Sequence, residues 1–155
     1  MADKKLEEVI DIAIKREEEA IAFYQGLYNR VQDKTAKDTL SFLVGEEKKH
    51  KEFLLKYRQG NYTADALRMT TVVDYRIAEH LEKPDPAADM ESKDVYLVAA
   101  HRELASYNFY TALAALHPDG ELKQLLVKIA GEELRHKEKV EYLYANTAFP
   151  QTDGG

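Results

Sequence analysis

Two copies of a Glu-x-x-His motif carry amino acids that both bind transition metals. They are Glu47-x-x-His50 and Glu133-x-x-His136. Positions i and i+3 lie on one face of a helix, so each motif can offer a carboxylate and an imidazole to the same ion. A single motif of this kind arises often by chance, so the case for a metal site depends on its context.

That context is an internal repeat with an offset of 86 residues, which carries position 17 onto 103 and position 47 onto 133. The chain has two Glu-x6-Tyr pairs, Glu17 with Tyr24 and Glu103 with Tyr110, and the same offset relates them. It has no further Glu-x-x-His motif. Both kinds of motif therefore belong to one duplicated unit.

The elements that must position these residues are helices, because apolar side chains recur at alternating steps of four and three. The first predicted helix covers about residues 4–30, and the second follows a turn and cap at 33–35. A third begins at a cap, Ser92, and a turn at 117–120 leads to the fourth. The repeat halves are thus about 4–58 and 92–145.

Residues 59–91 form a long crossover between the two halves, and 70–81 could be a short helix or an extended segment. The 155-residue chain has only 7 Gly and 4 Pro, which favours a single all-α domain. Two repeated hairpins joined by a long crossover predict a ferritin-like four-helix bundle over residues 1–147. Residues 148–155 are predicted to be a flexible tail.

Six polar residues interrupt the apolar stripes of this bundle. Burying four carboxylates in one core is costly unless cations compensate their charge, and two divalent ions would do so. Within each half the two glutamates are 30 positions apart, centred on the turn, so they lie level on antiparallel helices. The predicted metal ligands are Glu17, Glu47, His50, Glu103, Glu133 and His136.

The composition of the chain excludes several classes of protein and of metal site. The net charge of -6 disfavours nucleic-acid binding, and no apolar run is long enough to cross a membrane. The absence of cysteine excludes iron–sulfur clusters and zinc ribbons, so any metal is held by oxygen and nitrogen. We expect a cytoplasmic protein, with a homodimer as its assembly.

These motifs resemble the di-iron carboxylate site of the ferritin-like superfamily, especially rubrerythrin-like proteins, over about residues 6–145. The resemblance implies that Glu47 and Glu133 bridge two irons, and that the other four predicted ligands each bind one iron. It also implies that Tyr24 and Tyr110 orient ligand carboxylates. The chain departs from rubrerythrins at Ser106, where they carry a further glutamate linked to redox-dependent ligand exchange. It also lacks the cysteines of their rubredoxin domain.

The leading hypothesis is a di-iron redox enzyme that reacts with hydrogen peroxide or dioxygen and takes electrons from an external donor protein. The alternative is ferritin-like iron binding, with ferroxidase activity and iron storage or detoxification. A third hypothesis is a helical interaction protein without metal. Manganese or a mixed metal pair would also accept this ligand set.

Other polar residues have ordinary structural interpretations. Four glutamates adjoin the predicted ligands but fall off the apolar stripes, so a solvated or helix-surface role is expected for them; they are Glu18, Glu19, Glu46 and Glu132. The three remaining histidines have no partner in the repeat and are expected at the surface or at helix ends; they are His80, His101 and His117.

Overall fold

A computed structural model describes residues 4–60, 76–81, 83–84 and 90–148. These residues are 87% helical and form five helices and no strand. The predicted all-α helical bundle is therefore confirmed. The helices are α1 (Lys4–Arg30), α2 (Lys34–Arg58), α3 (Ile77–His80), α4 (Ser92–Ala115) and α5 (Glu121–Ala148).

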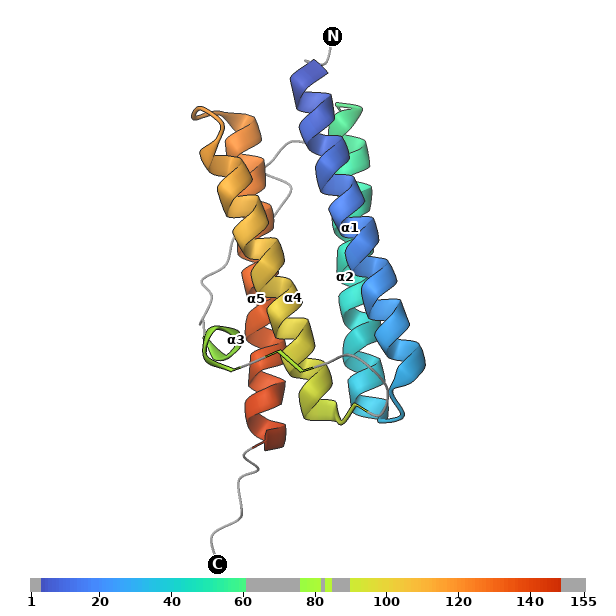
Figure 1. The fold of residues 1–155 in the computed structure, drawn as a ribbon. Helices are drawn as coiled ribbons and strands as arrows, with labels where there is room; N and C mark the ends of the chain where they lie inside the picture. Colours follow the sequence, from blue (N-terminus) through green and yellow to red (C-terminus); the bar gives the residue numbers. More distant parts are fainter. Residues whose placement is uncertain (1–3, 61–75, 82, 85–89, 149–155) are drawn as a thin grey trace, which may run out of the picture.

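The four long helices form two hairpins that lie side by side (Figure 1). One hairpin is α1 with α2, the other is α4 with α5, and their turns lie at opposite ends of the bundle. The end of α2 and the start of α4 therefore also lie at opposite ends, as a long crossover requires. Among the described residues, most close backbone contacts between helices lie within the hairpins.

The helix ends follow the sequence expectations with two exceptions. One is Ala148, which was predicted to begin the flexible tail but is the last residue of α5; residues 149–155 of that predicted tail lie outside the described part. The other is the start of α4. The Asp33 carboxylate accepts a 2.9 Å hydrogen bond from the backbone N–H of Ala36 and caps α2, as predicted. The cap predicted at Ser92 was wrong, because Ser92 is the first helical residue of α4. Glu91 occupies the cap position with extended backbone and makes no side-chain capping hydrogen bond. The start of α4 follows from the extended backbone at Glu91, which the residue types alone do not reveal.

The apolar core is divided into two clusters. One cluster contains Ile10, Leu54 and Ile129, and the other contains Leu27 and Leu40 with neighbours from the opposite hairpin. The stripe positions between these clusters hold the polar residues predicted as ligands. Within the described part of the chain, no helix has the length and apolar content needed to cross a bilayer.

The short helix α3 lies in the crossover, within the segment that was predicted as helix or extended chain. The backbone N–H of Ala78 donates a 2.8 Å hydrogen bond to Glu141 of α5, and the Lys137 ammonium lies 2.8 Å from Glu79. Lys137 also lies 3.1 Å from Glu141, and both side chains are fully buried. We name Glu79, Lys137 and Glu141 the α3 clamp. Residues 61–75 lie outside the described part.

Candidate metal centre

The six predicted ligand residues come together at mid-height in the bundle, and each is at most 5% exposed. Their side chains form two groups, to which each residue contributes one nitrogen or oxygen atom. In each group these atoms all lie within 4.8 Å of one another. Glu47 and Glu133 belong to both groups. The first group adds Glu17 and His50, and the second adds Glu103 and His136.

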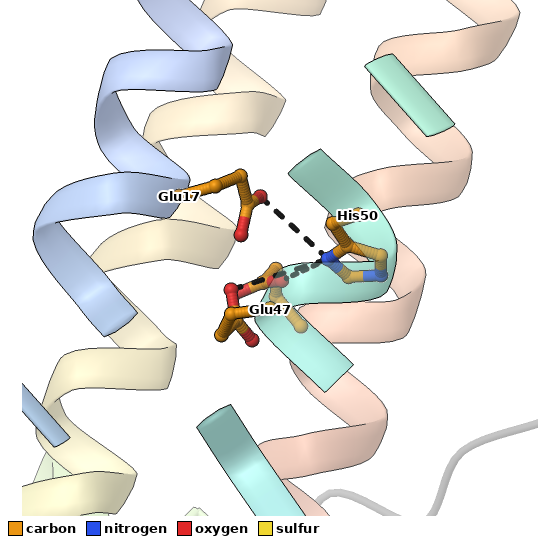
Figure 2. Close-up of side chains that lie close together, drawn as sticks. Glu17, Glu47 and His50 are labelled. Atoms are coloured by element: carbon orange, nitrogen blue, oxygen red, sulfur yellow. Dashed lines mark ion pairs between the residues drawn. The ribbon is translucent and has the colours of Figure 1, made fainter. Parts of the chain in front are cut away.

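Both imidazoles direct Nδ1 toward this cluster. His50 Nδ1 lies 3.6 Å from the Glu17 carboxylate and 3.0 Å from that of Glu133. Figure 2 shows Glu17 of α1 converging on Glu47 and His50 of α2. In the repeat-related half, His136 Nδ1 lies 3.1 Å from Glu47 and 3.6 Å from Glu103. The two halves thus present equivalent donor sets.

Two tyrosines cross-link the hairpins at this level. The Tyr24 hydroxyl donates a 2.7 Å hydrogen bond to Glu103, and the Tyr110 hydroxyl donates a 2.8 Å bond to Glu17. Each tyrosine therefore orients a carboxylate of the other hairpin rather than of its own. Burial raises the pKa of both phenols, and the neighbouring carboxylates raise it further, so both stay protonated donors.

The four carboxylates divide into two electrostatic classes. Burial raises the pKa of Glu47 and of Glu133 well above the usual range, and the facing carboxylates add to that rise. Burial also opposes ionisation of Glu17, but contacts with Glu47, His50 and Tyr110 lower its pKa to about 2. The pKa of Glu103 is likewise lowered, against burial, by His136. Without metal, the two shared carboxyls therefore keep their protons to a higher pH than a solvated glutamate does.

A metal pair fits this donor set. Among the described residues, each of the six has one buried nitrogen or oxygen with no hydrogen-bond partner. The short approaches between them lack hydrogen-bond geometry, and orphaned buried polar atoms are costly unless something else satisfies them. The orphaned atoms are Glu17 Oε2, Glu47 Oε1, His50 Nδ1, Glu103 Oε2, Glu133 Oε1 and His136 Nδ1.

Metal-free protein is expected to lose stability as the pH rises above about 5. The folded-state pKa of Glu47 and of Glu133 is raised. Their contribution to the free energy of unfolding is therefore complete below about pH 4.5 and is lost as the pH climbs through the folded-state pKa. Burial lowers the pKa of His50, but Glu17 and neighbouring carboxylates raise it overall, which gives the same sign. Thermal melts of metal-free protein between about pH 5 and about pH 9 measure this slope.

The control for this prediction is Glu47→Gln, which keeps the size of the side chain and removes one titrating group. It should flatten the decline in melting temperature with pH. A metal-free wild-type protein whose melting temperature stays constant or rises over this range would contradict the raised pKa of the shared carboxyls.

One carboxylate outside the stripes, expected in a solvated or helix-surface role, contacts a predicted ligand instead. Glu132 contacts His50 Nε2, and its side chain is 18% exposed. Its repeat partner Glu46 approaches His136 Nε2 to 3.9 Å and is 23% exposed. The signal for both was their place in the duplicated Gly-Glu-Glu segment, immediately before a predicted ligand. Carboxylates on the outer nitrogen of a ligating histidine fix its ring orientation.

The remaining polar residues lie where the sequence placed them. Glu18 and Glu19 are exposed on α1, and His80 is exposed at the end of α3. His117 donates from Nδ1 to the Leu113 carbonyl at the end of α4, a distance of 2.8 Å. His101 similarly bonds the Leu81 carbonyl at 2.8 Å.

Comparison with known proteins agrees with this geometry. Residues 1–58, which include Glu17, Glu47, His50 and Tyr24, match the family model described as Rubrerythrin. Searches of curated proteins and of solved structures found no match. The second hairpin repeats the matched motifs at the 86-residue offset. Over its first hairpin the chain is therefore rubrerythrin-like, as its ligand motifs predicted.

Proposed function

We propose that this protein is a di-iron redox protein that reacts with hydrogen peroxide or dioxygen. The observation that carries the proposal is the pair of four-residue donor groups that share Glu47 and Glu133. In this arrangement Glu47 and Glu133 would bridge the metals. Glu17 and His50 would complete one position, and Glu103 and His136 the other.

A bound iron pair would supply the electrons that reduce the oxidant. The protein's own groups hold the carboxylates in place: Tyr24 orients Glu103, and Tyr110 orients Glu17. Apolar clusters lie on both sides of the site, and each of its four carboxylates is 1% exposed. This sequence has no cysteine that could hold a rubredoxin-type iron, and an external donor protein returning the electrons is part of the proposal. A cytoplasmic location belongs to this proposal, because that compartment is reducing.

Anaerobic reconstitution with ferrous iron tests the proposal, and about two ions per chain are expected because one chain holds both donor groups. Glu18→Gln should leave the count unchanged, since Glu18 is exposed beside a proposed ligand. Elemental analysis that finds one ion or none in the wild type would contradict the proposal. So would loss of metal from Glu18→Gln.

Stopped-flow mixing of the reduced protein with peroxide and with dioxygen then separates the two functions. We expect faster oxidation by peroxide, with the iron content constant through repeated turnover. The alternative is ferritin-like iron handling, which Ser106 favours because a serine replaces the glutamate that rubrerythrins use for ligand exchange. Faster oxidation by dioxygen together with growing iron content would support that alternative.

A further inference from the structure

The two donor groups differ in their access to solvent, although the repeat makes their ligands equivalent. A pocket of about 620 Å³ lies on the α2–α5 side of the bundle. His136, Phe42, Glu46 and Glu132 are among the residues that line it, whereas His50 is not. The His136 imidazole therefore borders this cavity, whereas the His50 imidazole, which is 2% exposed, does not line it.

The surroundings of the two outer imidazole nitrogens differ in the same way. His50 Nε2 is held by Glu132, and the His50 side chain is 2% exposed. His136 Nε2 lies 3.9 Å from Glu46, beyond hydrogen-bond reach. A carboxylate therefore fixes the His50 ring, whereas the His136 ring lacks an equally close one.

Phe42 covers the less constrained ring. Its ring meets that of His136 edge-on, with centroids 6.4 Å apart. Phe42 is 38% exposed, so the side chain can change rotamer quickly without opening the bundle. The repeat places Lys128 at the corresponding position of the other half (42 + 86 = 128), so the repeat supplies no aromatic ring at the position that matches Phe42.

We propose that the pocket is the exchange route for a divalent metal ion at the Glu103–His136 position, and that the Glu17–His50 position is closed. This inference rests on the proposed metal centre. Acidic and basic side chains line the pocket in equal number, three of each, so net charge does not select the ion. The ion is instead taken up by oxygen and imidazole ligands, first Glu46 and then the donors around His136.

Cobalt(II) release tests this directly. Protein loaded with two Co²⁺ ions per chain is mixed with excess chelator, and the cobalt absorbance is followed. We expect two phases of equal amplitude, with rates that differ by about tenfold or more. Phe42→Ala should accelerate the fast phase and leave the slow phase unchanged. Lys128→Ala, the repeat-matched control, should leave both phases unchanged.

Modification of the metal-free protein with diethylpyrocarbonate, mapped by mass spectrometry, identifies the open side without any metal. His136 should react faster than His50. Two bound ions that leave in a single phase, an unaltered fast phase in Phe42→Ala, or faster modification of His50 would each overturn the inference while leaving the metal centre intact. Binding of fewer than two ions would instead overturn the proposed function, and the inference with it.

Discussion

Saturating metal is expected to raise the free energy of unfolding by about 4 kcal/mol per site at a thousandfold excess over Kd, provided the unfolded chain does not bind it. Without metal, the carboxylates at Glu17, Glu47, Glu103 and Glu133 share one interior and must hold protons or repel one another. Bound metal would replace those protons and satisfy the donor atoms that lack hydrogen-bond partners. Denaturant titrations with and without ferrous iron, performed anaerobically, measure the difference.

Glu47→Ala should abolish most of this metal-dependent stabilisation, because Glu47 belongs to both donor groups. The metal-free variant should lose less stability than an ordinary core truncation, since the substitution also removes repulsion among buried carboxylates. Glu18→Gln serves as the control and should keep the full metal effect. Equal stabilisation of the wild type and Glu47→Ala by metal would show that the ions bind elsewhere.

Lys137→Met is expected to cost about 3–5 kcal/mol, because it leaves the fully buried Glu141 without its cation. Lys51→Met is a matched control, since the repeat relates Lys51 to Lys137. Lys51 pairs with the exposed Glu18 at 3.5 Å, so its loss should cost about 1 kcal/mol or less. Urea denaturation of both variants gives the comparison.

Hydrogen exchange adds a local measurement for the α3 clamp. In Lys137→Met, amide protection should fall first at α3, because the backbone N–H of Ala78 donates to Glu141. Similar losses of stability in the Lys137→Met and Lys51→Met variants would show that the clamp contributes nothing beyond a surface ion pair. Unchanged protection at α3 would show that other contacts hold this segment.

Local periodicity explains why the long helices and the donor residues were predictable. The alternating stripe that contains Ile10, Glu17 and Tyr24 is buried on α1, which spans the predicted residues 4–30. Level placement of Glu17 and Glu47 needs only the rise of a helix and a short turn. Such features depend on spacing along one hairpin, which a sequence displays directly.

The features that escaped prediction depend on contacts between distant segments. Lys137 and Glu141 have the i,i+4 spacing of an ordinary surface ion pair, yet both are fully buried and contact residues of α3. Glu132 lies off its own stripe, yet it reaches His50 because α2 and α5 face each other. Neither arrangement leaves a periodic signal, since the partner comes from another part of the chain.

The sharing of Glu47 and Glu133 also has a kinetic consequence. Each donor group takes three residues from one hairpin and the fourth from the other, and both tyrosine hydrogen bonds cross the same boundary. Most close backbone contacts between helices of the described residues lie within the hairpins, so we expect each hairpin to act as a local folding unit and the boundary between the hairpins to be weaker. Metal bound at both donor groups would link the two hairpins across this boundary. Hairpin separation would then limit the unfolding rate, and a chelator would accelerate unfolding with little effect on the formation of either hairpin.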